Sequence, residues 1–287
     1  MLSDHTVWFA FNQGSGSNSD AALAEIDAAF ARAGCTPARR ISFPDDDAPT
    51  ARDLEEAGVD ILAIFAGDGT INSLVTGLKG WSGAVLALPG GTMNLLAARM
   101  HGEASAPEIL DRVASGKARK VRPPIIRCRH GDGLTGMLAG PGTAWNNVRE
   151  ALREADVVGV VTSTTEAIGE STGGPAVVCR EPQTGRAEGY AAIMLSPHED
   201  GIELDGFYAD NVSHYLQQGL ALLRRNFRLG PHEELGTFRK FVLASTENSP
   251  IGLLIDGEPA REVDAEESFE LARCGVDLLE TIETAAE

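Results

Sequence analysis

The sequence predicts an α/β protein with two domains, in which an N-terminal domain built on a parallel sheet precedes a β-rich C-terminal domain. Two observations support this prediction. In the first third of the chain, short apolar runs that end in glycine turns alternate with helical patterns. In much of the remainder, many short strand-like runs are separated by turn residues. The length of 287 residues is sufficient for two ordinary domains.

Three buried strands, each followed by a helix, are predicted in the N-terminal domain. The strands are the continuous apolar runs at residues 7–11, 61–66 and 84–88. The helix after the first strand extends over about residues 19–33, with Asn18 or Ser19 as its N-cap and Gly34 at its end. Repetition of strand, turn and helix predicts a parallel sheet with helices on its faces.

The pattern changes near Pro123 and Pro124, where mostly β-structure is predicted to begin. The expected strands are residues 125–129, 134–138, 157–162, 176–179, 190–195, 202–208, 240–244 and 251–255. Two helices are expected to interrupt them, at residues 145–156 and 211–225. Short strands with turns between them predict a β-sandwich-like second domain. The predicted domains are residues 1–122 and 123–274, with residues 275–287 as a segment that returns to the first domain.

Composition and charge argue against several classes of protein. No apolar run reaches the ~18 residues needed to cross a bilayer, and no signal peptide is predicted at the N-terminus. The four cysteines form no CxxC pair, so a disulfide framework or a zinc site is not expected. A net charge of −18 argues against a nucleic-acid partner. A cytoplasmic protein is the expectation.

Two groups of basic residues stand out against this acidic background. They are Lys117, Arg119, Lys120, Arg122, Arg127 and Arg129 in one stretch, and Arg224, Arg225 and Arg228 in another. One interpretation is a solvated surface that balances nearby acids. The other is a local basic face that meets phosphate or an anionic membrane.

Glycine turns follow all three predicted strands, at residues 12–16, 67–70 and 89–92. In open α/β folds the ligand lies beyond the carboxyl ends of the strands. Small residues there allow backbone N–H groups to approach phosphate oxygens, and Thr70 and Thr92 add hydroxyl donors. Neither common phosphate loop is present: GxxxxGK[ST] is absent, and Asn72 occupies the position of the third glycine in GxGxxG.

The motifs in these turns resemble those of the diacylglycerol kinase catalytic-domain family, which includes bacterial lipid kinases and is distantly similar to NAD kinases. The family's GGDGT-x-N stretch is matched by residues 66–72, and its P-x-GT-x-N stretch by residues 89–94. Its opening N-P-x-SG turn is matched by residues 12–16, its DG turn by residues 200–202 and its late DGE by residues 256–258. The matches occur in family order along nearly the whole chain.

The resemblance implies a Rossmann-like nucleotide domain followed by a lipid-binding β-sandwich-like domain. It also implies that ATP and Mg²⁺ are the cofactors. The implied nucleotide-binding residues are Asn12, Ser15, Gly16, Ser42, Gly67, Asp68, Gly69, Thr70, Asn72, Gly91, Thr92 and Asn94. Asp68 is implied in the magnesium network, and Asp200 corresponds to a position where some relatives bind a second magnesium.

Two residues are candidates for the catalytic base, since some relatives use the Asp of GDGT and others the Glu of DGE. These residues are Asp68 and Glu258 here, and the comparison favours Glu258. A carboxylate near the acceptor hydroxyl is needed to take its proton. Without the resemblance, Glu258 would be interpreted as a surface acid of an Asp-Gly hairpin turn.

The implied activity is transfer of the ATP γ-phosphate to the hydroxyl of a diacylglycerol-like or sphingoid-like lipid. The implied lipid substrate predicts transient contact with the inner membrane surface, and a homodimer is among the expected oligomeric states. Leu95 stands where relatives often carry Asp, which motivates a second alternative, a degenerate protein that binds nucleotide or lipid without turnover. A third alternative is a kinase for a soluble substrate of the NAD kinase type.

A rival motif occurs at residues 169–173, which match the GxSxG nucleophile elbow around Ser171. The elbow requires a helix directly after the nucleophile. Pro175 follows too closely for such a helix, so this match is interpreted as chance.

Overall fold

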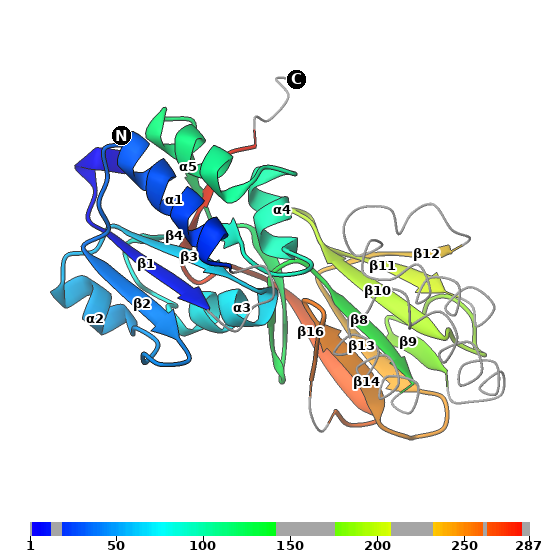
Figure 1. The fold of residues 1–287 in the computed structure, drawn as a ribbon. Helices are drawn as coiled ribbons and strands as arrows, with labels where there is room; N and C mark the ends of the chain where they lie inside the picture. Colours follow the sequence, from blue (N-terminus) through cyan, green and yellow to red (C-terminus); the bar gives the residue numbers. More distant parts are fainter. Residues whose placement is uncertain (1, 13–18, 142–175, 208–231, 261–262, 283–287) are drawn as a thin grey trace. The chain divides into compact units, whose positions relative to one another are not determined.

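The computed structural model describes residues 2–12, 19–141, 176–207, 232–260 and 263–282 (Figure 1). The chain divides into two compact units, one made of Met1–Pro123 with Arg273–Glu287 (unit 1) and the other of Pro124–Ala272 (unit 2). The strand predicted at 157–162, the helices predicted at 145–156 and 211–225, the GxSxG motif and the second basic group lie outside the described residues. Within the described residues, no helix has both the length and the apolar character to span a bilayer.

Unit 1 is organised around a six-stranded sheet with the order β2-β1-β3-β4-β17-β5. Its strands are β1 (Val7–Asn12), β2 (Arg39–Phe43), β3 (Ile61–Ala66), β4 (Ala84–Pro89), β5 (Arg119–Val121) and β17 (Asp277–Glu280). Strands β1 to β4 and β17 run parallel, and β5 pairs with β17 in the antiparallel direction. The C-terminal strand therefore completes the sheet that the N-terminal residues begin.

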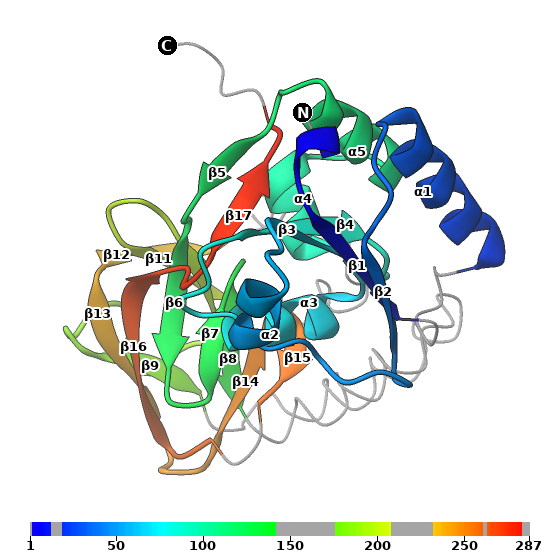
Figure 2. The same ribbon diagram turned by 90° about the vertical axis from the view of Figure 1, so that its left-hand side faces the viewer.

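Helices cover both faces of this sheet (Figures 1 and 2). They are α1 (Asp20–Arg32), α2 (Ala51–Glu56), α3 (Asp68–Gly77), α4 (Leu95–His101) and α5 (Ala106–Ala114), and a short 3₁₀ turn, η1 (Leu2–Asp4), precedes β1. Helices α1 and α5 pack on one face, where Phe30 and Leu110 join Phe9, Phe65 and Leu86 of the strands in one apolar core. Helices α2 and α3 lie on the opposite side.

Unit 2 consists of two sheets with the orders β12-β11-β10-β8-β14-β15 and β7-β6-β16-β13-β9. Its strands are β6 (Pro124–Cys128), β7 (Gly131–Gly133), β8 (Met137–Pro141), β9 (Val177–Glu181), β10 (Ala192–Pro197), β11 (Ile202–Phe207), β12 (Glu233–Phe238), β13 (Lys240–Ser245), β14 (Ile251–Ile255), β15 (Glu258–Pro259) and β16 (Glu266–Arg273). Both sheets contribute to a shared apolar core, with Leu195 and Leu253 from one and Phe241 and Phe269 from the other. The predicted fold class, a parallel-sheet α/β domain followed by a β-sandwich-like region, is confirmed.

The strand predicted at 134–138 is wrong in its first half, because β8 begins only at Met137. The backbone N–H groups of Leu134, Thr135 and Gly136 donate to the carboxylate of Asp256 instead of to a neighbouring strand. A side chain more than a hundred positions away therefore decides where this strand begins.

Candidate active site

The glycine turns after β3 and β4 begin at one edge of the parallel sheet of unit 1. The strands are in register there, with Asn12 opposite Phe43 and Ala66 opposite Pro89. Because neighbouring parallel strands end together, the segments that follow them project from a common edge. The predicted residues Asn12 and Ser42 lie at the tips of β1 and β2 at this edge.

The turns after β3 and β4 touch one another through two glycines. A Cβ atom added to Gly91 would lie 2.6 Å from the Cα of Gly67, closer than real Cβ contacts allow. By contrast, a Cβ added to Gly67 would meet nothing nearer than the Cα of Gly91, at 3.9 Å. Gly91 is therefore required by the packing of the turns. Gly67 is not, and its φ of −73° suits any residue.

Asp68 begins α3 and links the two turns a second time. Its Oδ1 accepts a hydrogen bond of 3.4 Å from the backbone N–H of Leu96, in the first turn of α4. The N-terminal N–H groups of a helix have no partner within the helix, so a carboxylate there acts as a cap. The half-buried Asp68 side chain therefore holds the start of α4 beside the start of α3.

The Asn94 side chain stabilises the turn after β4, a role that was not predicted. Its Oδ1 accepts from the N–H of Gly91 at 2.7 Å, and its Nδ2 donates to the carbonyl of Gly91 at 2.8 Å. Its backbone is left-handed, with φ 55° and ψ 40°, a conformation that Asn tolerates better than most residues. The side chain thus closes the turn after β4.

The remaining predicted nucleotide residues differ in exposure and contacts. Asn12 donates from Nδ2 to Thr70 Oγ1 at 3.4 Å, which links the tip of β1 to the first turn of α3. Gly69 and Asn72 are half-buried on α3, whereas Thr92 is exposed. The hydroxyl of Ser42 is buried without a hydrogen-bond partner among the described residues. Ser15 and Gly16 lie outside the described residues.

Glu258, the favoured base, lies in unit 2 on the hairpin formed by β14 and β15. It pairs with Ile255 across a two-residue turn made of Asp256 and Gly257. Both turn residues have positive φ, 50° and 87°, as expected of an Asp-Gly hairpin turn. The Glu258 side chain is exposed, whereas that of Asp256 is buried.

Asp200, the predicted second metal ligand, is exposed in the hairpin turn between β10 and β11. In that turn the N–H of His198 donates to the carbonyl of Gly201 at 2.8 Å. Nowhere in the described part of the chain do three or more His, Cys, Asp or Glu side chains gather as a cation would require.

The described basic residues of the first group are largely balanced by acids. Arg119 pairs with Glu280, Arg122 with Asp277, Arg127 with Asp132, and Arg129 with Asp264. These pairs favour the interpretation of a solvated, internally balanced surface.

Comparison with known proteins shows what the N-terminal part of the chain is similar to. Residues 6–123 match the family described as "Diacylglycerol kinase catalytic domain". This stretch of the chain is therefore similar to that domain. The match ends where the first segment of unit 1 ends, so the matched residues include the glycine turns after β3 and β4. The matched family is one of kinases, enzymes that transfer phosphoryl groups.

Solved structures share the fold of the whole chain at low sequence identity. A diacylglycerol kinase from Bacillus anthracis str. Sterne superposes with a TM-score of 0.63 at 13% identity, over 96% of this chain and 97% of that one. A candidate diacylglycerol kinase from the same organism gives 0.64 at 13% identity, with the same coverage. A yeast NADH kinase in complex with NADH gives 0.49 at 10% identity, over 98% of this chain and 84% of that one. No curated protein matches the sequence.

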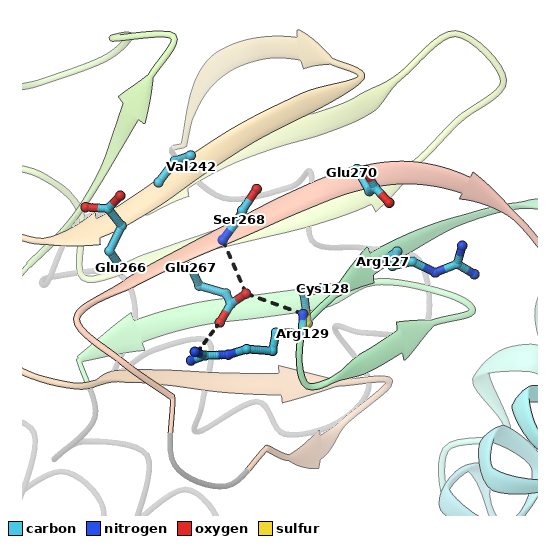
Figure 3. A pocket seen from close by; sticks show the side chains of 8 residues that line it. All are labelled: Arg127, Cys128, Arg129, Val242, Glu266, Glu267, Ser268 and Glu270. Atoms are coloured by element: carbon cyan, nitrogen blue, oxygen red, sulfur yellow. Dashed lines mark hydrogen bonds and ion pairs between the residues drawn. The ribbon is translucent and has the colours of Figure 1, made fainter.

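Outside the matched residues, unit 2 has a pocket of about 450 Å³ on the sheet that contains β6 and β16 (Figure 3). Several charged residues that line it form ion pairs: Arg129 approaches Glu267 and Asp264, and Arg127 binds Asp132 through two nitrogens. Burial raises the pKa of the Cys128 thiol there to about 11, so this thiol is protonated and a poor nucleophile at neutral pH. None of the residues that line the pocket was predicted as a site residue.

Two structural roles were not predicted, that of Asn94 in closing the turn after β4 of unit 1 and that of Asp256 as a hydrogen-bond acceptor in unit 2. The Asn94 role has a local signal, because Asn directly before a helix and three residues after a glycine can reach back to that glycine. The Asp256 role has none, because its partners lie in residues 134–136.

Proposed function

We propose that the protein is an ATP-dependent lipid kinase that transfers the γ-phosphate of ATP to the hydroxyl of a diacylglycerol-like or sphingoid-like lipid. The observation that carries the proposal is the match of residues 6–123 to the diacylglycerol kinase catalytic domain. This stretch contains both glycine turns, whose contact through Gly67 and Gly91 forms a compact edge at the strand tips.

Gly67 supports the nucleotide part of the proposal. Nothing in its backbone or described surroundings demands a glycine, so the absence of a side chain is best explained by close approach of a ligand. Gly67 is also the N-cap of α3 and has no side chain to cap that helix. The N–H groups at the N-terminus of α3 and the helix dipole favour a phosphate. In this proposal the phosphates lie along the turns, near Gly69, Thr70, Asn72 and Thr92.

Magnesium fits this site as a partner that arrives with the nucleotide. Mg²⁺ keeps several waters and is bound through one or two carboxylates together with substrate phosphates. Asp68 offers one carboxylate, and the described residues contain no fuller cage. When bound, the ion would neutralise charge on the phosphates, and Asp68 would hold it beside the first turn of α3.

Glu258 acts as the general base in the proposed reaction. The acceptor hydroxyl oxygen forms a bond to the γ-phosphorus, the bond from that phosphorus to the ADP oxygen breaks, and the hydroxyl proton passes to the Glu258 carboxylate. Phosphoryl transfer depends mainly on positioning and charge stabilisation, so an exposed carboxylate is adequate provided that it meets the hydroxyl. The lipid acceptor requires reversible contact of the protein with a membrane surface.

Leu95 motivates a second candidate function, binding without turnover. Leu95 is buried, with 6% exposure, and its apolar side chain offers no carboxylate at this position. A protein that binds ATP yet transfers no phosphate to any acceptor would have this candidate function.

The experiment that tests the proposal supplies magnesium and γ-labelled ATP with phosphatidylcholine vesicles that contain diacylglycerol, ceramide or sphingosine. One of these lipids should be labelled. Asp68→Asn and Glu258→Gln should each reduce the rate by about 100-fold or more, as expected for loss of a positioned acid or base. Asp264→Asn, a change at an exposed unit 2 carboxylate, is the matched control and should leave the rate unchanged.

Each alternative has its own outcome in this assay. Labelling of NAD but of no lipid would identify a kinase for a soluble substrate. Tight ATP binding without any labelled acceptor would identify the binding-only protein. Normal rates for both Asp68→Asn and Glu258→Gln would show that the site is assigned to the wrong residues.

A further inference from the structure

Asp256 forms a dense cluster of hydrogen bonds two residues before Glu258. Its carboxylate accepts from the N–H groups of Leu134 at 2.8 Å, Thr135 at 2.8 Å and Gly136 at 3.2 Å, and from the Thr135 hydroxyl at 2.6 Å. Its own N–H donates to the carbonyl of Gly136 at 3.0 Å. The residue is only 5% exposed, so these bonds form away from water, where hydrogen bonds to a charged acceptor are strong.

The segment that Asp256 binds is itself tightly packed. A Cβ atom added to Gly136 would lie 3.0 Å from the carbonyl oxygen of Leu195 in β10. One added to Gly133 would lie 2.9 Å from the Met137 side chain. Residues 133–137 therefore have little room to move, and Asp256 fastens the β14–β15 turn to a well-packed part of unit 2.

Glu258 depends on this turn for its placement. It belongs to β15, which contains only two residues, and its partner Ile255 directly precedes Asp256. The Glu258 side chain is exposed, so packing around the side chain contributes little to holding it in place. The direction in which it projects is thus determined mainly by the backbone of residues 255–258.

We propose that Asp256 is a positioning residue for Glu258: by clamping the β14–β15 turn to residues 134–136, it fixes the backbone from which the base projects. This inference rests on the proposed kinase function. A base displaced by about 1 Å can cost about 100-fold in rate, so a buried clamp next to an exposed base matters for turnover.

Asp256→Asn is the variant that tests the clamp. Asn tolerates the left-handed backbone at this position, but its uncharged amide has one carbonyl oxygen and presents an N–H₂ group to other donors. Amide hydrogen exchange of residues 134–136 and 255–258 should become about tenfold faster or more than in the wild type. Asp264→Asn in the same unit should leave this exchange unchanged.

Kinetics of the double variant distinguish positioning from general loss of structure. With magnesium ATP and the lipid that the wild type labels, Asp256→Asn should lower kcat by about 10- to 100-fold and change the KM for ATP by about twofold or less. In the Glu258→Gln background the same change should have an effect of about twofold or less, because the residue that it positions is already disabled.

Two results would overturn the inference while the proposed function stands: unchanged amide exchange in Asp256→Asn, or a kcat loss that multiplies with that of Glu258→Gln. Failure of the proposed function is visible separately, in the wild type alone. If the wild type labels no acceptor, the function is refuted and the catalytic role of Asp256 is refuted with it.

Discussion

His101 is a buried histidine that connects α4 to β17. It is 1% exposed, and its Nδ1 lies 2.9 Å from the hydroxyl of Thr281, just beyond the C-terminal strand. Burial lowers the pKa of His101 to about 4, since the charged imidazolium would lose its hydration, and the nearby Arg112 guanidinium also disfavours the charge. The imidazole is therefore neutral in the folded protein at physiological pH.

This histidine predicts a loss of stability in mild acid. In the unfolded chain His101 takes up a proton below its ordinary pKa of 6.5, whereas the folded protein resists the proton until about pH 4. Its stabilising contribution is thus complete above pH 6.5 and declines as the pH falls toward 4. The free energy of unfolding should decrease by roughly 2 to 3 kcal/mol over this interval through His101.

Urea unfolding of the wild type and His101→Gln at pH 7 and pH 5 measures this contribution. The variant should have the shallower pH dependence, whatever its stability at pH 7. His5→Gln, a change at an exposed histidine, is the control and should retain the slope of the wild type. Identical slopes in wild type and His101→Gln would contradict the prediction.

At the scale of elements, the contact between the turns after β3 and β4 predicts an asymmetry between glycines. Gly91→Ala would force the added methyl to within 2.6 Å of the Gly67 Cα, and the backbone must move to relieve this overlap. We expect a loss of about 1 to 3 kcal/mol in the free energy of unfolding.

Gly77→Ala, in the helix that follows the turn after β3, provides the control. Gly77 ends α3, and an added Cβ there would meet nothing within 4 Å. Since alanine favours the helix over glycine, this variant should be more stable by about 0.5 to 1 kcal/mol. Equal urea midpoints for Gly91→Ala and the wild type would show that the turns are not in contact in solution.

Elements with a strong local signal were predicted well. The bounds of β3 and β14 agree with the predicted residues 61–66 and 251–255. Strand β3 is buried along its whole length, and continuous burial produces a continuous apolar run. Ser19 was also predicted as a helix cap, and its hydroxyl does accept from the N–H of Ala22 at 3.2 Å. Such features depend on residues that are neighbours in sequence.

Other elements were missed because their stability comes from distant partners. Strand β2 begins with two exposed arginines, and β16 alternates acids with apolar residues, so neither has a continuous apolar run.

Helix α5 could have been predicted, since Ser105 and Glu108 form a capping box around Pro107. The glycine turns of unit 1 were evident from the sequence. The Gly67–Gly91 contact and, in unit 2, the Asp256 cluster were not, because each joins segments that are separated in the chain.

At the scale of the whole molecule, the C-terminal strand is essential to unit 1. Val276, Leu278 and Leu279 are buried at 0, 1 and 6% exposure, and Leu278 pairs with both Val85 of β4 and Val121 of β5. Each such side chain contributes about 1.5 to 3 kcal/mol, and a typical domain has only about 5 to 15 kcal/mol in total. Loss of the strand should therefore abolish the stability of unit 1.

A chain that ends at Cys274 tests this prediction. Its thermal unfolding should lose the cooperative transition of unit 1, and the resolved amide spectrum of residues 2–123 should collapse. A chain that ends at Ile282 retains all of β17 and should behave as the full-length protein. Leu278→Ala, which keeps the chain length, should lose about 2 to 5 kcal/mol. A folded unit 1 in the chain ending at Cys274 would refute the prediction.

The place of β17 between β4 and β5 also has a consequence for biosynthesis. The ribosome synthesises residues 1–123 before residues 277–280. The sheet that the first segment begins therefore has a gap until residues 277–280 emerge from the exit tunnel. All of Pro124–Ala272 is translated in the interval. The nascent first segment must therefore remain with apolar β4 unpaired on one side, and its sheet is completed only after residues 277–280 have been made.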